Sequence, residues 1–338
     1  CSSLAELIIS ERANVTGEKI MLTSNDTPAE EFQKAISLGA IINLDDITHI
    51  DFLEENAGLP KILSFRYNPA DIMNSGNDII GKPAEAKYGL TRQQIFDAYK
   101  ISQGKGVKRF GLHTMIASNE RETETFLYTA QIMFELAVEI KNRIGINLEF
   151  VNLGGGFGIP YRPEENPVDY KAIGAGIFEL YKKILVPNGL EKIRIATESG
   201  RAITGDAGWL VSTVIHEKNT YKNYIGLDSC MANLMRPALY GAYHHITILG
   251  KENAPCDKIY DVTGSLCENN DKFAINRALP KIDIGDILII HDTGAHGHAM
   301  GFNYNGKLRS AELLLRENGE IELIRRAETL EDYFATLV

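Results

Sequence analysis

The sequence predicts two kinds of domain in succession: a (β/α)8 TIM-type barrel whose first units are missing, and an antiparallel β domain. Over residues 1–203, strand-like apolar runs alternate with amphipathic helical runs, a pattern typical of parallel strands joined by crossover helices. Over residues 204–338, short alternating strands are separated by Gly, Asn and Asp turns. The 338 residues, 44% of them hydrophobic, are enough for both domains.

Six strands support the barrel prediction. They cover residues 19–24, 40–44, 61–67, 109–114, 148–153 and 193–198. Helical periodicity between them predicts helices over residues 28–38, 91–104 and 120–144. Because a closed barrel of this type has eight strands, two further units are expected upstream of Cys1.

The first residues carry the signal for a helix start. Ser3 and Glu6 have the spacing of a capping box ahead of the apolar residues Leu4, Leu7 and Ile8. A helix that begins at once, with no strand and no initiator Met before it, is an unusual start for an alternating α/β protein. We therefore expect residue 1 to be a truncation point.

The second part of the chain predicts strands over residues 209–217, 245–249 and 286–291, and a short closing helix over residues 328–337. No linker rich in Pro, Gly or Ser separates the two parts, so we expect domains 1–203 and 204–338 to pack closely.

Composition excludes several classes of partner. The formal net charge is −10 and no long basic run occurs, which argues against nucleic acid and for a small-molecule substrate. No apolar run approaches the roughly 20 residues of a membrane-spanning helix, so we expect a cytoplasmic protein. The spacing of the four cysteines fits neither a zinc site nor a disulfide scaffold, which predicts free thiols and no metal site.

Two strand ends carry candidate chemistry. Gly154, Gly155 and Gly156 form a glycine-rich turn that could aim backbone N–H groups at a phosphate, or could serve only as a tight turn. The next strand ends with Glu198, whose carboxylate could hold a pyridinium nitrogen, and with Gly200 and Arg201, whose amides could face a phosphate. A structural salt bridge between Glu198 and Arg201 is the alternative interpretation.

Several motifs together resemble those of diaminopimelate decarboxylases. They are GGGFG at residues 154–158, ESGR at 198–201, the segment 226–240 and LCENND at 266–271, with the flanking runs SSLAEL, GLHTMIASNE, YHH and YNGKLRSAELL. They occur in the order and approximate spacing of that family and span the whole chain. The resemblance implies an alanine-racemase-like fold, pyridoxal 5'-phosphate as the cofactor and a homodimer with shared active sites.

The resemblance also implies roles for individual residues. The cofactor would be bound by Ser118, Gly154, Gly155, Gly156, Glu198, Gly200, Arg201 and His296. The substrate would be bound by Arg201, Arg236, Tyr240 and Glu268. Cys267 would donate a proton in the active site of the neighbouring subunit, although a lone Cys in such a sequence context is more often a buried side chain. His244 and His245 are interpreted as structural residues.

Three positions depart from the family pattern. The family's Schiff-base lysine belongs to a strand upstream of the segment that matches Cys1, and no lysine in this chain occupies that motif. The common His-x-His pair reads His113-Thr114-Met115, so a thioether replaces the imidazole usually stacked on the cofactor ring. The family's Gly-Ala-Tyr ends here in His296.

The sequence therefore favours decarboxylation of meso-2,6-diaminopimelate to L-lysine, the last step of lysine biosynthesis. A related decarboxylase of ornithine, arginine or carboxynorspermidine is the nearest alternative. A catalytically silent binding or regulatory homologue is the alternative of another class.

Overall fold

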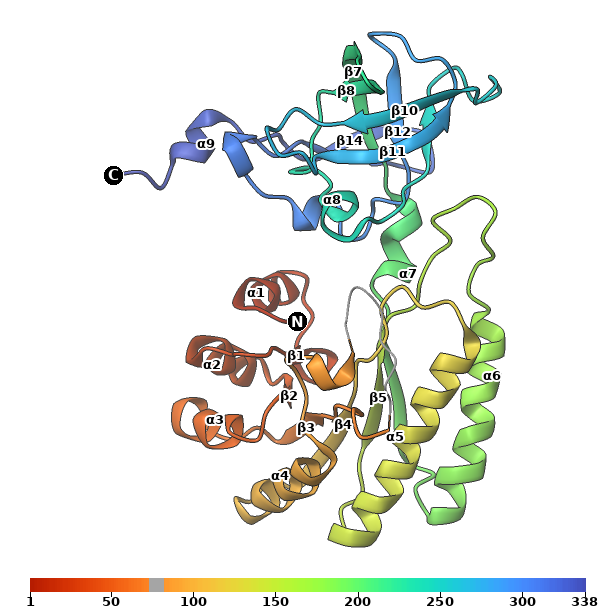
Figure 1. The fold of residues 1–338 in the computed structure, drawn as a ribbon. Helices are drawn as coiled ribbons and strands as arrows, with labels where there is room; N and C mark the ends of the chain where they lie inside the picture. Colours follow the sequence, from red (N-terminus) through yellow and green to blue (C-terminus); the bar gives the residue numbers. More distant parts are fainter. Residues whose placement is uncertain (73–81) are drawn as a thin grey trace. The chain divides into compact units, whose positions relative to one another are not determined.

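A computed structural model describes residues 1–72 and 82–338 (Figure 1). By their contacts, the residues form two units. The first comprises Cys1–Gly158 and Val168–Ser199, and the second comprises Ile159–Pro167 and Gly200–Val338. The segment Ile159–Pro167 thus belongs to the second unit, although its neighbours on both sides in the chain belong to the first.

The first unit is built on one six-stranded parallel sheet. Its strands are β1 (Met21–Thr23), β2 (Ile41–Leu44), β3 (Ile62–Arg66), β4 (Arg109–His113), β5 (Phe150–Gly155) and β6 (Arg194–Glu198). Each strand pairs in parallel with the next in sequence, in the order β1-β2-β3-β4-β5-β6. All six predicted strands are confirmed, and their sequential order is that of a TIM-type barrel.

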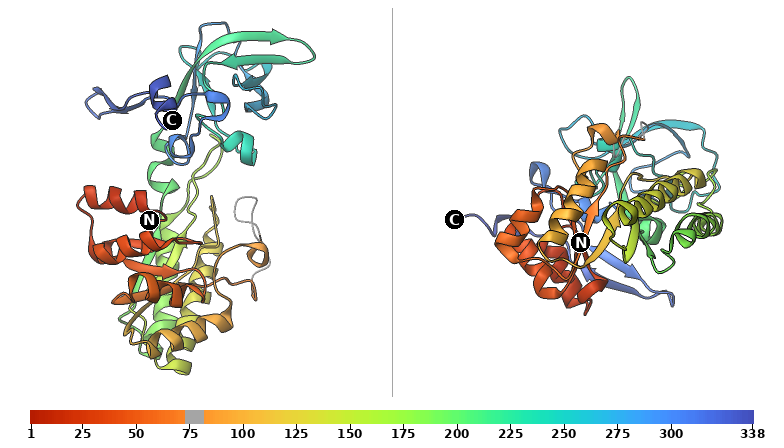
Figure 2. Two further views of the ribbon diagram at one scale, coloured as in Figure 1. Left: turned by 90° about the vertical axis from the view of Figure 1, so that its left-hand side faces the viewer. Right: turned by 90° about the horizontal axis from the view of Figure 1, so that it is seen from below.

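The helices of this unit line the outer side of the curved sheet (Figure 2). They are α1 (Leu4–Arg12), α2 (Ala29–Leu38), α3 (His49–Ala57), α4 (Arg92–Gly104), α5 (Thr123–Ile144) and α6 (Tyr170–Leu180). The predicted helices correspond to α2, α4 and α5. Helices α3 and α6 were not predicted, although each has apolar residues at helical spacing, Ile50 and Leu53 in α3 and Ile173, Ile177 and Leu180 in α6.

Helix α1 begins where the capping signal indicated. The Ser3 hydroxyl accepts a hydrogen bond from the Glu6 amide at 3.3 Å. The Glu6 carboxylate, however, accepts from the amide of Ser2 at 2.6 Å, so the second bond of the expected capping box lies one residue earlier.

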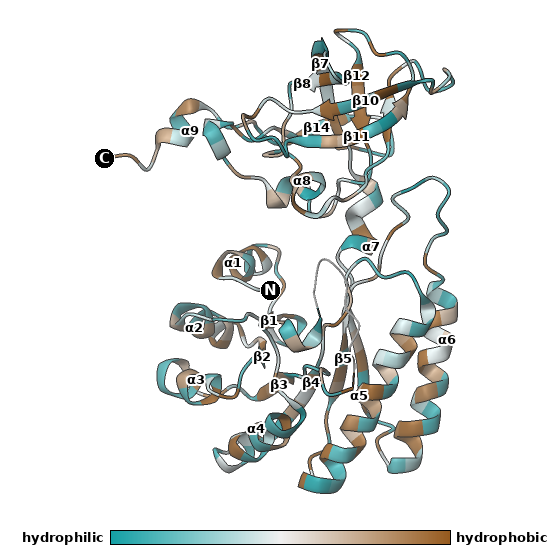
Figure 3. Ribbon diagram, in the orientation of Figure 1, coloured by the Kyte–Doolittle hydropathy of each residue, from teal (hydrophilic) through white to brown (hydrophobic). Residues whose placement is uncertain are grey.

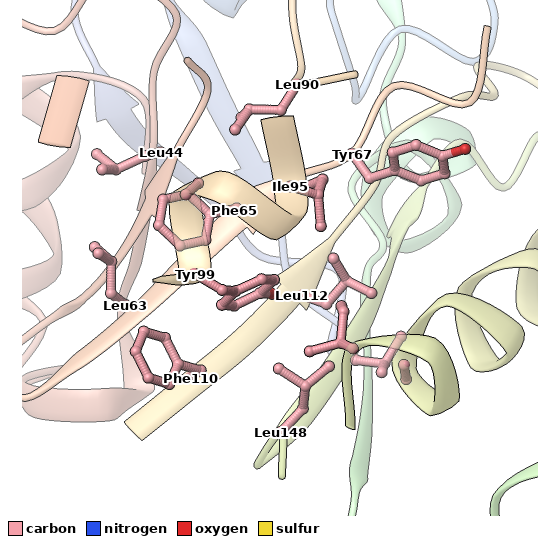
Figure 4. Packing of buried hydrophobic residues seen from close by; sticks show 14 of the residues in the cluster. Leu44, Leu63, Phe65, Tyr67, Leu90, Ile95, Tyr99, Phe110, Leu112 and Leu148 are labelled. Atoms are coloured by element: carbon pink, nitrogen blue, oxygen red, sulfur yellow. The ribbon is translucent and has the colours of Figure 1, made fainter. Parts of the chain in front are cut away.

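The core of the first unit lies between the sheet and its helices (Figures 3 and 4). Tyr99 of α4 packs edge-on against Phe65 and Phe110, with ring centroids 5.0 and 5.4 Å apart. The Tyr99 hydroxyl donates to the carbonyl of Gly111, which satisfies its one buried polar group. These contacts fix strands β3 and β4 against α4.

The second unit contains a six-stranded sheet and a separate hairpin. The strands are β7 (Leu210–Asn219), β8 (Asn223–Leu227), β9 (Ile246–Ile248), β10 (Lys258–Thr263), β11 (Lys272–Leu279) and β12 (Ile287–Ile290), followed by β13 (Glu312–Leu315) and β14 (Ile321–Arg325). Short helices α7 (Arg201–Thr204), α8 (Arg236–Tyr240) and α9 (Leu330–Phe334) complete it.

The order of the main sheet is β11-β10-β8-β7-β12-β9. All its pairs are antiparallel except β8 with β10, which is parallel. The predicted β domain is thus confirmed, with one parallel pair among otherwise antiparallel strands. The chain between β8 and β10 passes through α8 and β9, and such a long connection allows parallel pairing where a hairpin does not.

Among the described residues, no helix combines the length and the apolar character that a membrane span requires. Nor do His, Cys, Asp or Glu side chains gather there in groups of three or more that could hold a metal ion.

Candidate active site

The predicted site residues of the first unit lie at the carboxyl ends of β4, β5 and β6. Ser118 follows β4, the three glycines end β5, and Glu198 ends β6. Because the strands are parallel neighbours, these ends share one edge of the sheet, where barrel enzymes place their active sites.

Glu198 is held through one of its two carboxylate oxygens. Oε1 accepts a hydrogen bond from Nδ2 of Asn152 at 2.8 Å and lies 3.3 Å from Nε2 of His113. Oε2 has no hydrogen-bond partner among the described residues, and the side chain is 40% exposed. One carboxylate oxygen is thus fixed and the other is available to a ligand.

Glu198 is also kept ionised. Burial alone would raise its pKa, but the contact with His113 and the hydrogen bond from Asn152 outweigh burial and hold the pKa below its usual value. His113 is itself buried, and its Nδ1 lies 3.1 Å from Nδ2 of Asn43. At neutral pH this group therefore presents a negative oxygen at the strand ends.

Neighbouring backbone atoms require glycine at all three positions of the turn. A Cβ on Gly154 would lie 2.3 Å from the carbonyl oxygen of Thr114, and one on Gly156 would lie 2.3 Å from that of Ala117. Gly154 and Gly156 also have φ angles of +74° and +89°, which other residues rarely adopt. On Gly155 a Cβ would lie 2.0 Å from the Glu198 carbonyl oxygen.

The amides of this turn are only partly available to an anion. The Gly154 amide donates to Oδ1 of Asn152 at 2.9 Å, and the Gly155 amide donates to Sδ of Met115 at 3.1 Å. The amides of Gly154 and Gly155 are therefore already bonded to neighbouring side chains, that of Gly155 through a weak N–H···S contact.

Ser118 belongs to the segment that runs beside the glycine turn. The Glu120 amide donates to the Gly156 carbonyl at 2.8 Å, and Glu120 forms a parallel bridge with Phe157.

The second unit buries two arginines that have no carboxylate partner among the described residues. Arg201 is 7% exposed and Arg236 is 3% exposed. Within the part of the chain that the structure describes, neither forms an ion pair with a carboxylate. Instead, Nη1 of Arg201 donates to the hydroxyl of Tyr161, and the Arg236 guanidinium lies over the Tyr161 ring, 4.5 Å from its centroid. Buried positive charge of this kind calls for an anionic ligand.

Two further predicted residues belong to this arginine cluster. Desolvation, and then the positive charges of Arg201 and Arg236, lower the pKa of His296. Tyr240 lies four residues after Arg236 on α8, and hence on the same face of that helix. The structure thus brings together Arg201, Arg236, Tyr240 and His296.

Cys267 and Glu268 lie on a separate loop, between β10 and β11. The Cys267 thiol is exposed, which excludes the interpretation as a buried side chain, and its sulfur lies 3.0 Å from Nδ2 of Asn305. Buried Asp271 closes the loop by accepting from the amides of Leu266 at 2.8 Å and Met231 at 2.6 Å. Asp271 therefore fixes the loop that presents Cys267 and Glu268.

The described groups fit pyridoxal 5'-phosphate. The unbonded Oε2 of Glu198 can accept from a pyridinium N–H, and this matches the low pKa of that carboxyl. A Cβ on Gly200 would meet no atom within 4 Å, which leaves space at the start of the segment that carries Arg201.

Comparison with known proteins agrees with this assignment. Residues 85–294 match the family described as pyridoxal-dependent decarboxylase, C-terminal sheet domain. Protein TabA of Pseudomonas amygdali pv. tabaci is 40% identical over 333 residues, which are 98% of this chain and 77% of that protein. The diaminopimelate decarboxylase of Methanothermobacter thermautotrophicus is 34% identical over 331 residues, with coverage of 98% and 77%.

Solved structures give the same result. Diaminopimelate decarboxylase from M. jannaschii in complex with L-lysine superposes with a TM-score of 0.89 at 30% identity, covering 100% of this chain and 78% of that one. The Helicobacter pylori enzyme complexed with L-lysine gives a TM-score of 0.88 at 26% identity, with coverage of 99% and 82%. The chain belongs to the pyridoxal-dependent decarboxylase family, and pyridoxal phosphate is its cofactor.

The sequence did not reveal the residues that hold the candidate site residues in place through contacts distant in sequence. Asn43 and Asn152 lie within apolar strands and were not singled out. A single Asn in a buried strand indicates a side chain that needs hydrogen-bond partners, and this could have identified both residues. Tyr161 gave no signal, because its role comes from contacts with residues distant in sequence.

Proposed function

We propose that the protein decarboxylates meso-2,6-diaminopimelate to L-lysine with pyridoxal 5'-phosphate, as the last step of lysine biosynthesis. One observation carries the proposal: two buried arginines, Arg201 and Arg236, have no carboxylate partner among the described residues, in a chain that is 34% identical to a diaminopimelate decarboxylase. Such arginines suit a substrate carboxylate, because a guanidinium donates two parallel charge-assisted hydrogen bonds.

The proposed division of labour follows from the geometry of the side chains. Pyridoxal phosphate, when bound, supplies an electron sink for the electron pair left as carbon dioxide departs. Glu198 holds a proton on the pyridine nitrogen through Oε2, because Asn152 and His113 keep its carboxyl ionised. Ser118, the amides of the glycine turn, Gly200, Arg201 and His296 bind the cofactor. Arg201, Arg236 and Tyr240 bind the substrate carboxylate that the product L-lysine retains.

Cys267 and Glu268 complete the site in this proposal. Cys267 donates a proton to the substrate carbon, and Glu268 binds the distal amino group. The loop is exposed, and Asp271 fixes its shape. Exposure suits a loop that enters the active site of a second subunit, so we propose a homodimer with shared sites. We also propose that the protein is cytoplasmic and that its domains are 1–203 and 204–338.

A related amino acid is the second candidate substrate. The 40% identical relative carries the name Protein TabA and not that of a diaminopimelate decarboxylase, and Met115 and His296 depart from the common pattern of that family. Ornithine, arginine and carboxynorspermidine share the α-amino acid group and differ at the distal end.

A substrate panel tests the proposal. The holoenzyme is incubated with each of meso-diaminopimelate, ornithine, arginine and carboxynorspermidine, and carbon dioxide release is followed. We expect kcat/KM to be highest for meso-diaminopimelate by at least about 100-fold, because a lost distal polar contact leaves buried groups unpaired. A higher kcat/KM for another substrate would reassign the activity, and no turnover of any of them would favour a silent homologue.

A further inference from the structure

Tyr161 contacts both buried arginines of the second unit. Its side chain is 6% exposed and belongs to the segment Ile159–Pro167, which directly follows the glycine turn in sequence. The hydroxyl accepts from Nη1 of Arg201, and the ring lies 4.5 Å from Cζ of Arg236. One aromatic side chain therefore limits the directions that both guanidiniums can take.

His244 fixes Arg236 a second time. Nη1 of Arg236 lies 2.7 Å from Nε2 of the fully buried His244. Because a guanidinium can only donate, Nε2 must be the acceptor, and the ring proton must lie on Nδ1. Nδ1 then donates to the carbonyl of His291 at 2.7 Å. The imidazole is thus held in one tautomer, with its lone pair aimed at Arg236.

The two positioning groups also contact each other. The Tyr161 and His244 rings meet edge-on, with centroids 5.1 Å apart. Next to them, the guanidiniums of Arg162 and Arg277 lie 4.0 and 3.9 Å from the centroid of Tyr243. Nη1 of Arg277 also donates to the carbonyl of His244 at 2.9 Å. The segment that carries Tyr161 is therefore tied to the second unit by two adjacent layers of ring and guanidinium contacts.

The partners of Arg201 and Arg236 among the described residues share one chemical property: none of them carries a negative charge. Tyr161 offers a hydroxyl and a ring face, and His244 offers a neutral nitrogen. They orient the guanidiniums without neutralising them, so the full charge stays available to an anion. A carboxylate partner would orient an arginine equally well but would compete with the ligand.

We propose that Tyr161 and His244 are positioning residues that hold Arg201 and Arg236 in the directions needed to bind the anionic groups of cofactor and substrate. The inference rests on the proposed function, because that function assigns Arg201 to the cofactor phosphate and the substrate carboxylate and Arg236 to the carboxylate. Long arginine side chains lose rotamer freedom on binding, and prior orientation removes that cost.

Two single substitutions separate the two arginines. Tyr161→Phe removes the hydroxyl that orients Arg201 and keeps the ring beside Arg236. His244→Leu removes the acceptor for Arg236 at similar volume, whereas His244→Gln can restore an acceptor oxygen. Tyr260→Phe is the matched control, because Tyr260 is a buried tyrosine of the same unit whose hydroxyl accepts from the Ile282 amide, away from the arginines.

The readouts are dissociation constants of the full-length protein for pyridoxal phosphate and, in the holoenzyme, for L-lysine. We expect Tyr161→Phe to weaken both about tenfold, and His244→Leu to weaken L-lysine about tenfold with cofactor affinity unchanged. KM should rise by a similar factor with kcat within about threefold. His244→Gln should recover most of the L-lysine affinity, and Tyr260→Phe should bind both ligands like the wild type.

The same series distinguishes failure of the inference from failure of the proposed function. If Arg201→Ala and Arg236→Ala lose L-lysine affinity while Tyr161→Phe and His244→Leu do not, the positioning roles are wrong and the proposed function stands. If Arg236→Ala retains full L-lysine affinity, the assignment of Arg236 in the proposed function is wrong. Melting temperatures identify a variant that has lost its fold, and if His244→Leu does so, Tyr161→Phe decides.

Discussion

Asn152 connects Glu198 to the glycine turn. Its Nδ2 donates to Oε1 of Glu198 at 2.8 Å, and its Oδ1 accepts from the Gly154 amide at 2.9 Å. The groups proposed to hold the two ends of the cofactor are thus joined by one buried side chain.

Asn152→Asp tests this connection. The substituted side chain can still accept from Gly154, but it replaces the donor to Glu198 with a second acid. We expect the pKa of Glu198 to rise, because a favourable hydrogen bond is replaced by like-charge repulsion. The acid limb of the kcat profile should move to higher pH by about one unit or more. An unchanged profile would show that Asn152 does not control the Glu198 carboxyl.

Glu198→Gln tests the role of the carboxylate itself. Glutamine keeps the shape but cannot maintain a proton on the pyridine nitrogen, so kcat should fall about 100-fold or more. Cofactor affinity should stay within about threefold, because the phosphate contacts are untouched. Glu191→Gln, at an exposed residue of the same unit, is the control. Full turnover by Glu198→Gln would refute the assigned role.

His244 should titrate far below an ordinary histidine. Burial is the largest cause of the shift, and the positive charges of Arg236, Arg201 and Arg277 act in the same direction. Although the hydrogen bond to His291 opposes them, together they lower the pKa of His244 from 6.5 to about 4. A proton NMR titration should show one imidazole with a midpoint near pH 4 that is absent from His244→Gln. A midpoint above pH 6 would contradict the neutral, hydrogen-bonded imidazole.

The same shift predicts a pH dependence of stability. Between pH 6.5 and 4 the unfolded chain binds a proton at His244 and the folded chain does not, so protonation favours unfolding as the pH falls through this window. Relative to His244→Gln, the wild type should lose about 3 kcal/mol of unfolding free energy between pH 7 and pH 4. A constant difference between the two proteins would contradict the prediction.

The proposed shared site makes a prediction about mixed dimers. Inactive Cys267→Ala subunits mixed with inactive Arg201→Ala subunits should form heterodimers with one intact and one doubly damaged site. Random pairing makes half of the dimers mixed, so activity should recover to about a quarter of the wild-type value. No recovery after verified subunit exchange would place Cys267 and Arg201 in the same subunit's site.

The sequence predicted those parts of the fold that local patterns determine. All six strands of the first sheet were predicted, because each is a short apolar run between turn residues. The parallel pairing of β8 with β10 was not, because no local pattern encodes which distant strands become neighbours. Helix α6 was missed although Ile173, Ile177 and Leu180 form an apolar face that packs on the core.

The site shows the same division. Glu198 and the glycine turn were predicted from residue type and strand position. The bond from Asn152 to Glu198 spans 46 positions, and Tyr161 gains its role only through contacts with Arg201 and Arg236. Such supporting residues require the fold to be known.

Conversion of meso-diaminopimelate to L-lysine with pyridoxal phosphate can be measured as the product stoichiometry of the holoenzyme, with the cofactor-free protein as control. We predict one carbon dioxide and one L-lysine for each meso-diaminopimelate consumed, and no conversion without the cofactor. Consumption without equimolar L-lysine, or the absence of any conversion by a protein shown to hold the cofactor, would rule out this activity.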